Sequence, residues 1–151
     1  MSPPVGGAMK VRQISVFLEN KKGRLLEVLE TLAKAKINIR ALSIADTSEF
    51  GILRLIVPEP EQARKALEKD GFTVGEHEVI VVGVNDRPGG LASILKVLNG
   101  ANLNVEYLYA FVARSGNKAV VVLRTENINS GIKALQKGGV KVLSASEVYH
   151  L

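Results

Sequence analysis

With 151 residues, of which 46% are hydrophobic and 23% charged, the chain is long enough for one or two folded domains and is not a disordered protein. It has no cysteine, which excludes disulfides and thiolate chemistry. It also has neither a secretory signal nor an apolar run near the roughly 18 residues of a membrane span, so we expect a cytoplasmic protein. The net charge of +5 is spread over both halves, with 12 basic against 9 acidic residues in 1–75 and 8 against 6 in 76–151, and no aromatic ladder accompanies it, which argues against binding to nucleic acid.

The first elements follow an unpatterned start. Residues 1–8 are expected to be a disordered leader or an expression remnant ahead of Met9. The segment 11–18 is rich in β-branched residues and alternates in polarity, which predicts a strand. Apolar residues then recur at helical spacing over 25–32, which predicts an amphipathic helix with one buried stripe.

The first half continues with a hairpin, a helix and a strand. Two β-rich segments, 37–45 and 52–57, flank a turn and predict the hairpin. Helical spacing returns over 60–70, and Gly71 is placed as the residue that ends this helix. A further strand is expected from Phe72.

The second half repeats this order. Shifted by 66 positions, the segment 19–39 lies over 85–105 without a gap, and its apolar residues and glycine coincide with those of the second copy. The coinciding pairs are Gly23 and Gly89, Leu25 and Leu91, Val28 and Ile94, Leu29 and Leu95, Leu32 and Leu98, Ala35 and Ala101, and Asn38 and Asn104. The matching elements are strand 79–84, helix 91–98, strands 103–113 and 118–124, helix 127–138 ended by Gly139, and a last strand from Val140. A period of this length is that of a small domain and indicates a tandem duplication.

The order of elements predicts the fold. The order βαββαβ, twice, predicts an α+β protein of two ferredoxin-like units, each a four-stranded antiparallel sheet with both helices on one face. We expect one domain over 9–77 and a second over 78–151. Between the halves there is no Pro/Gly/Ser-rich linker, only Gly75, so the last strand of the first copy should run almost directly into the second copy.

The turn at 85–91 is the segment most suggestive of chemistry. Pro88 favours a helix start, Gly89 and Gly90 let a ligand approach the backbone, and the free amides of a helix start accept an anion. A capped helix start with nothing bound explains this turn equally well by itself. An asparagine at the next strand, Asn104, recurs in the first copy as Asn38, and this repeated pairing favours a ligand site.

These residues resemble a known family. Asp-Arg-Pro-Gly-Gly-Leu, followed fifteen residues after Gly89 by Leu-Asn-Val, looks like the ACT domain, a βαββαβ module that binds amino acids and regulates metabolic enzymes. The resemblance covers nearly the whole chain from Met9, twice. The chain is similar in particular to small proteins made of two ACT domains without a catalytic domain. In the first copy, Glu-Asn-Lys-Lys-Gly-Arg-Leu has Lys22 in place of the family's proline.

The resemblance also implies where a ligand lies. In the family, effectors such as serine, phenylalanine or isoleucine lie at interfaces between adjacent ACT domains, held by the first loop and by the asparagine at the start of the second strand. By position, the implied ligand-binding residues are Asn20, Gly23, Arg24, Leu25 and Asn38 in the first copy and Asp86, Gly89, Gly90, Leu91 and Asn104 in the second.

The two copies are not chemically equivalent. Asp86 only accepts hydrogen bonds at neutral pH and can take an ammonium group, whereas Asn20 can accept from an ammonium or donate to a carboxylate. Lys21, Lys22 and Arg24 would make the first loop more attractive to anions, and the replacement of proline by Lys22 could equally be neutral. We therefore expect at most one high-affinity site per chain.

The second strand of the second copy has two apolar faces. Tyr107, Tyr109 and Phe111 alternate with smaller apolar residues. Because a two-layer unit covers only one face of its sheet, the other face would need a partner, and we predict a homodimer. The alternative, in which the aromatic residues pack under the helices, stays open because the sequence does not assign the face.

No residue pattern points to catalysis. His77 and His150 match no metal-ligand spacing, and no nucleophile–base set, carboxylate pair or phosphate-binding fingerprint occurs. We therefore expect no enzyme, no cofactor and no metal. The leading hypothesis is a non-catalytic amino-acid-binding regulatory protein that modulates a metabolic partner. The alternative is a protein–protein interaction module with an empty or degenerate ligand site; an enzyme of unknown type or a nucleic-acid binder has little but the positive charge in its favour.

Overall fold

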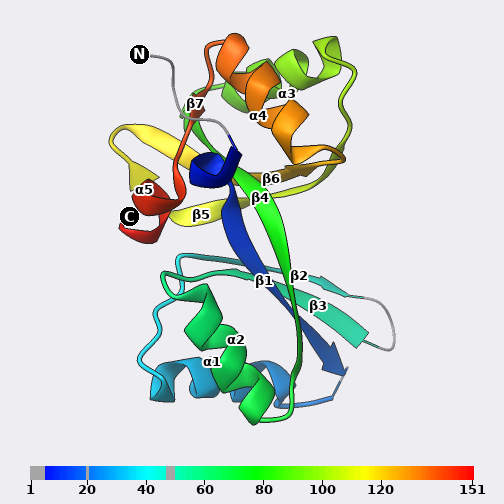
Figure 1. Cartoon of the computed structure of the whole chain (residues 1–151), viewed down its shortest axis with the longest axis vertical. Helices are drawn as coiled ribbons and strands as arrows, with labels where there is room; N and C mark the ends of the chain where they lie inside the picture. Colours follow the sequence, from blue (N-terminus) through cyan, green and yellow to red (C-terminus); the bar gives the residue numbers. More distant parts are fainter. Residues whose placement is uncertain (1–5, 20, 47–49) are drawn as a thin grey trace. The chain divides into compact units, whose positions relative to one another are not determined.

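The computed structural model describes residues 6–19, 21–46 and 50–151. The chain divides into two compact units, Arg12–His77 and a second unit that combines Glu78–Leu151 with residues up to Val11. Each unit follows the order βαββαβ, so the predicted α+β fold with two ferredoxin-like units is confirmed (Figure 1). No helix among the described residues is long and apolar enough to cross a membrane.

The unit Arg12–His77 pairs its strands antiparallel in the order β1-β3-β2, and β1 also pairs with β4. Its elements are β1 (Val11–Glu19), α1 (Arg24–Lys34), β2 (Ala41–Asp46), β3 (Phe50–Ile56), α2 (Pro60–Lys69) and the beginning of β4 (Thr73–Asn85).

The second unit has the strand order β5-β6-β4-β7, again antiparallel. After the 3-10 helix η1 (Gly6–Met9) and the remainder of β4, its elements are α3 (Gly90–Gly100), β5 (Val105–Ser115), β6 (Lys118–Thr125), α4 (Ile128–Lys137), β7 (Lys141–Val142) and α5 (Ala145–Tyr149).

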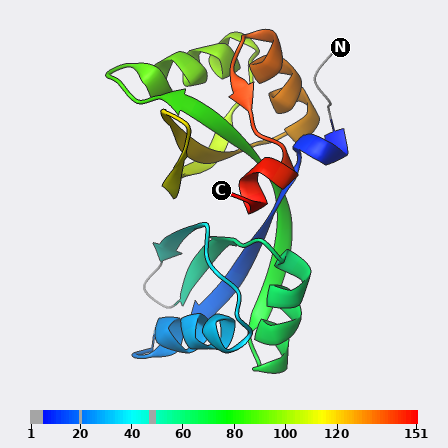
Figure 2. The same cartoon turned by 90° about the vertical axis from the view of Figure 1, so that its left-hand side faces the viewer.

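Each unit buries one face of its sheet under its two long helices (Figure 2). In the first unit, even-numbered β1 residues such as Ile14 and Val16 share a core with Leu32 of α1 and Leu67 of α2. In the second unit, a core of the same kind forms from Ile80, Val82, Val84, Val121, Leu123, Ile94, Leu98, Ile132 and Leu135. The period-2 and period-3.6 patterns of the sequence therefore meet in one core per unit.

The structure assigns the face of the β5 tyrosines that the sequence left open. Leu108 lies opposite the core residue Leu123, whereas Tyr109 lies opposite Val122 on the other face of the sheet. The rings of Tyr107 and Tyr109 stack with their centroids 6.5 Å apart. Tyr107 and Tyr109 thus lie on the face of the sheet away from α3 and α4, and Tyr109 is nevertheless buried, at 9% exposed.

Backbone turns recur at equivalent positions of the two copies. Gly71 and Gly139 have φ of 90° and 78° after α2 and α4, in the helix-ending role predicted for them. After α1 and α3 the left-handed residues are Lys36 and Asn102, with φ of 59° and 58°. The turns that follow occupy the residues up to 40 and 104, so the strands expected from 37 and 103 begin later, at Ala41 and Val105.

The N-terminal boundary differs from the one expected at residue 9. Residues 6–8, expected in a disordered leader, belong to η1 together with Met9. The Met9 side chain is 6% exposed and lies in the core of the second unit rather than the first. The buried Met9 side chain joins this segment to the core of the C-terminal half.

The C-terminal end also differs, because the strand expected from Val140 has only two residues. It is followed by α5, which the sequence pattern did not suggest. Ser144 and Glu147 form a reciprocal capping box at its start, and the backbone N–H of Ser144 lowers the pKa of the Glu147 carboxyl below 4.5. By contrast, β4 runs without interruption from Thr73 to Asn85, as the lack of a linker predicts.

Close packing of α4 on the sheet gives a stability prediction. A Cβ at Gly131 would lie 2.5 Å from Thr125 Oγ1 and 2.8 Å from Ile80 Cδ1, whereas a Cβ at Gly100 would meet nothing within 4 Å. We expect Gly131→Ala to lower the free energy of unfolding by about 1–3 kcal/mol through overpacking. Gly100→Ala, the matched control, should leave it unchanged or raise it by up to about 1 kcal/mol. Urea denaturation of both variants checks this, and equal effects would contradict it.

Candidate functional site

The turn between β4 and α3 is shaped by two glycines. We call residues 86–90 the Gly89 turn. Gly89 is the N-cap of α3 and has φ of 83°, in the left-handed region. At Gly90 a Cβ would lie 2.0 Å from the carbonyl oxygen of Asn85, so no side chain fits there. The turn closes through hydrogen bonds from Arg87 N–H to Asn85 O at 2.8 Å and from Gly90 N–H to Arg87 O at 3.0 Å.

The first amides of α3 remain available to a ligand. Ser93 N–H donates to Gly89 O at 3.0 Å, whereas the N–H groups of Leu91 and Ala92 have no acceptor in the described part of the chain. Free amides at a helix N-terminus attract an anion, and the helix dipole adds to this attraction. The Gly89 turn therefore presents donors of the kind that bind a carboxylate.

The corresponding turn of the first copy has a similar backbone. We call residues 21–24 the Gly23 turn. Gly23 is the N-cap of α1 with φ of 88°, and Arg24 N–H donates to Lys21 O at 3.3 Å. Leu25 lies in the first turn of α1, as Leu91 does in α3. Asn20, the remaining predicted residue of this turn, lies outside the described residues.

The side chains of the two turns differ more than the backbones do. Arg24 stands where the second copy has Gly90, and its guanidinium binds Glu27 at 2.7 Å and lies 4.9 Å from the ring centre of Phe72. Lys21 binds Glu19 at 2.9 Å, which lowers the pKa of the Glu19 carboxyl below 4.5. Two of the three cations that would attract an anion to the Gly23 turn are therefore already paired.

Asp86 of the Gly89 turn is also paired. Its carboxylate forms an ion pair with Arg114, near the end of β5, and both side chains are at least half exposed. Arg114 is not among the site residues predicted from the sequence. It reaches Asp86 because the β5–β6 hairpin ends beside β4, where Asn85 pairs with Lys118 and Lys118 Nζ donates to Asn85 Oδ1 at 3.3 Å.

The two asparagines lie at the opposite end of their units. Asn104 precedes Val105, which pairs with Thr125, whereas Asn85 pairs with Lys118. Lys118 and Thr125 are seven residues apart on β6, which corresponds to about 23 Å. Within one unit, Asp86 and Asn104 therefore cannot touch the same small ligand.

The first unit shows the same separation. Asn38 precedes β2, at the end of the sheet where Ala41 pairs with Ile56, while Glu19 pairs with Phe50 at the other end. The Asn38 side chain is exposed, and its Oδ1 accepts from Ile39 N–H at 2.9 Å. Gly23, Arg24 and Leu25 thus lie together, and Asn38 does not join them.

The described residues contain no group of three or more His, Asp or Glu side chains that could hold a metal ion. His150 is exposed, and its Nδ1 lies 2.8 Å from the carbonyl oxygen of Ser146. The chemistry available at the Gly89 and Gly23 turns is therefore that of backbone amides, one carboxylate and neighbouring cations, which can bind a small polar molecule.

Comparisons with known proteins agree with this architecture. The family described as "ACT domain pair" matches residues 9–146. The chain is 43% identical to protein BT0572 from Bacteroides thetaiotaomicron, with a TM-score of 0.90 over 97% of this chain and 100% of that one. A comparison with curated proteins found no match.

The fold also resembles two regulatory subunits of aspartate kinase. That of Thermus thermophilus, in a ligand-free form, is 17% identical with a TM-score of 0.62 over 91% of this chain and 99% of that one. That of Thermus flavus is 18% identical with a TM-score of 0.56 over 85% and 92%. At this identity the likeness concerns the fold alone. With the family match over 9–146 and the duplicated βαββαβ units, the chain belongs to the ACT domain pair family.

Proposed function

We propose that this protein is a non-catalytic regulator that binds a small amino acid between ACT modules and thereby modulates a metabolic partner. The observation that carries the proposal is the Gly89 turn, where Gly90 leaves no room for a side chain and the Leu91 and Ala92 amides lack an internal acceptor. Such a turn suits the carboxylate of an amino acid.

Asp86 would hold the ammonium group of the ligand. Its carboxylate binds Arg114, and both side chains of this pair are at least half exposed. Exposed ion pairs contribute only about 0–1 kcal/mol, so a ligand that supplies its own ammonium can replace Arg114. Release of Arg114, which lies near the end of β5, offers one way in which ligand binding could alter a protein surface.

A second module would complete the site. Because Asn104 lies about 23 Å from the Gly89 turn in its own unit, an asparagine that touches the ligand has to come from another ACT module. Asn38 and Asn104 are the two candidates. This requirement explains physically why such a ligand would be shared between modules, and it makes binding sensitive to how the modules associate.

The regulatory role is proposed by analogy of fold. Two proteins of similar fold are regulatory subunits of aspartate kinase. By analogy, the partner of this chain would be an enzyme, and the amino acid would change the affinity of the chain for that enzyme.

An interaction module with an empty ligand site is the second candidate. It is favoured by the Gly23 turn, where Arg24 is held by Glu27 and Phe72, and by Leu26 of α1, which is 59% exposed. Partner capture that is indifferent to every amino acid would favour this candidate over the first.

Titration of the chain with each of the twenty amino acids by calorimetry tests the proposal, and we expect at least one to bind. For that ligand, Asp86→Asn should weaken binding about tenfold, because a hydrogen bond to a charged group is lost. Arg114→Ala should tighten binding by up to about fivefold by freeing Asp86.

Glu106→Gln is the matched control for these variants. Glu106 binds Arg124 at 3.1 Å and lies on the same strand as Arg114, near the strand's other end. Its substitution should leave affinity unchanged. Absence of heat with all twenty amino acids would refute the ligand half of the proposal, and equal effects of Asp86→Asn and Glu106→Gln would refute the role of Asp86.

The two glycine N-caps provide a test of the asymmetry between copies. Gly23→Ala and Gly89→Ala place the same side chain in the same left-handed conformation with open space around it, and each should lower stability by about 1 kcal/mol. Only Gly89→Ala should also reduce the affinity for the amino acid. A stoichiometry of two ligands per chain, with both variants impaired, would contradict a single high-affinity site.

We also propose a homodimer, because large apolar side chains remain exposed on the strands: Leu42 and Ile44 of β2 are 38% and 46% exposed, and Leu108 of β5 is 38% exposed. Sedimentation at about 10 μM, a range that suits standard protein interfaces, should reveal a dimer. Ile44→Asp should shift the equilibrium toward monomer, whereas Asn99→Asp, which adds the same charge at an exposed position of α3, should not. Sedimentation of the unchanged chain as monomer alone would overturn this inference.

A further inference from the structure

The helices of the two units have the same bounds but different charges. α1 and α3 are both 11 residues long, and α2 and α4 are both 10 residues long. Together with the C-cap residue of α2, the helices of the first unit carry five basic and five acidic residues. Together with the C-cap residue of α4, those of the second unit carry three basic residues and no acidic one. The second helix layer therefore has an uncompensated positive charge.

Every acidic position of the first helix layer has lost its negative charge in the second. The five carboxylates of the first layer belong to Glu27, Glu30, Glu61, Glu68 and Asp70. The residues at the equivalent positions of the second layer are, in the same order, Ser93, Lys96, Asn129, Gln136 and Gly138. Because both layers fold in the same way, the fold does not require the carboxylates to be absent from the second.

The charges of the first helix layer are paired with one another. Arg24 binds Glu27 at 2.7 Å, and Lys65 lies 3.7 Å from Glu61. Cations and carboxylates three or four residues apart on a helix are neighbours, so such pairs offset the charge of the layer.

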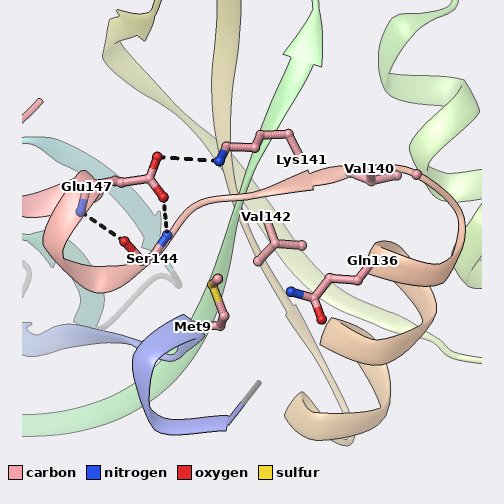
Figure 3. Close-up of a pocket in the computed structure, with 8 residues that line it drawn as sticks. Met9, Gln136, Val140, Lys141, Val142, Ser144 and Glu147 are labelled. Carbon is pink, nitrogen blue, oxygen red and sulfur yellow. Dashed lines mark hydrogen bonds and ion pairs between the residues drawn. The ribbon is translucent and has the colours of Figure 1, made fainter. Parts of the chain in front are cut away.

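The three cations of the second helix layer are exposed and unpaired. They are Lys96 of α3 and Lys133 and Lys137 of α4, and none of them forms an ion pair with any residue that the structure describes. Lys141, which follows α4, is different, because it binds Glu147 at 3.5 Å (Figure 3). We call Lys96, Lys133 and Lys137 the lysine face.

The residues of the lysine face lie close together. Lys133 and Lys137 are four residues apart and therefore share one side of α4. Gly138, next to Lys137, packs against α3, because a Cβ there would lie 2.7 Å from Val97 Cγ1. Val97 directly follows Lys96, and Figure 1 shows the two helices side by side. Like charges at these separations repel one another, so an anionic partner would be attracted to the face.

The composition of α3 and α4 limits the kind of anionic partner. Neither helix has an arginine or an aromatic residue, so no side chain can stack on a nucleic-acid base or bind a phosphate in a bidentate manner. Nor does either helix present a large exposed apolar side chain that would anchor it in a membrane. Such side chains lie elsewhere in the described chain, at Phe17, Leu26, Leu42, Ile44 and Leu108. Exposed lysines alone suit carboxylates.

From this combination we infer that the lysine face binds a partner protein through a segment of that protein rich in aspartate and glutamate. The partner's carboxylates would supply the negative charge that the first helix layer carries itself. Exposed charges of this kind accelerate association and select the partner, and each pair adds little affinity. The proposed function also requires a partner protein, but this inference uses no residue of the Gly89 turn.

Blocked hexaglutamate, acetylated and amidated at its ends, is the probe for this surface. In an amide NMR titration of the full chain at pH 7 and low salt, it should shift the signals of Lys96, Lys133, Lys137 and their neighbours. The amide signals of α1 and α2 should stay unchanged. Binding should be lost at about 1 M salt, where the screening length is about 3 Å.

The equivalent positions of the two copies provide matched variants. The double variant Lys133→Gln/Lys137→Gln should weaken binding of hexaglutamate about fivefold, as expected for the loss of two exposed ion pairs. Lys65→Gln/Lys69→Gln removes the same charge from the equivalent, also exposed positions of α2 and should change the affinity by less than about twofold.

Exchange of one residue between the copies separates local charge from net charge. Lys96→Glu places the first copy's residue in α3 and should weaken binding about tenfold, because it removes an attraction and adds a repulsion. Glu30→Lys makes the opposite exchange in α1 and raises the net charge of the whole chain. It should nevertheless change the affinity by less than about twofold.

Three outcomes would overturn the inference. Equal losses in the two double variants, or a gain with Glu30→Lys as large as the loss with Lys96→Glu, would mean that net charge decides binding. Tighter binding of a single-stranded oligothymidylate of equal charge would assign the face to nucleic acid instead. Failure of the Gly89 turn to bind any amino acid would leave these results unaffected, so the two proposals fail independently.

Discussion

The alternation of side chains along β4 is the constraint on which both units depend. This strand is thirteen residues long and supplies a strand to each unit. Its even-numbered residues, Val74 near one end and Ile80, Val82 and Val84 near the other, contact the helix-covered cores of the two units. Because the period of a strand is two, one inserted residue between Gly75 and Val79 would turn one of these sets away from its core. The number of residues between the two halves is therefore fixed by the structure, because both sets of side chains have to face their cores.

The same duplicated backbone carries different chemistry in its two copies. Gly23 and Gly89 hold nearly the same φ, and each begins a helix whose first amides point outward. At the next position one copy has a glycine in close contact with a carbonyl, and the other has an arginine bound to Glu27 and Phe72. A module that was duplicated can in this way keep one turn for a ligand while the other stabilises its own unit. This difference between the turns is the physical basis on which a single high-affinity site is proposed.

The fold could be predicted from sequence because its determinants are local and repeated. Apolar periodicity predicted the helices and strands. Because 19–39 aligns with 85–105 without a gap at an offset of 66 positions, the elements predicted in one copy could be checked against the other. The short helix α5 was not predicted, because five residues are too few to show helical periodicity. Ser144 and Glu147 do form the S-x-x-E pattern of a capping box. Met9 was assigned to the first unit because a single buried methionine leaves no pattern at all.

The candidate site was harder to predict, because it depends on separations that sequence spacing does not show. The Gly89 turn and Asn104 recur in the first copy as the Gly23 turn and Asn38, and this repetition suggested one cluster. In the structure α3 lies between them, so they stand at opposite ends of the unit. Arg114 is distant from Asp86 in sequence and reaches it only because the β5–β6 hairpin returns to the end of β4. Pairing register, which is a tertiary property, decided both points.

The left-handed residues after α1 and α3 have a consequence for how such a duplicated chain diverges. Lys36 and Asn102 have φ within a degree of one another, yet one side chain is a long cation and the other a short amide that tolerates this conformation better. The two copies therefore share a torsion angle at a position where their side chains differ in length and charge. The same hydrogen bond closes both turns, because Ile37 N–H and Leu103 N–H donate to the equivalent carbonyl oxygens of Leu32 and Leu98. Between the two halves of this chain, the course of the backbone at the end of the helix is kept where the side chain is not.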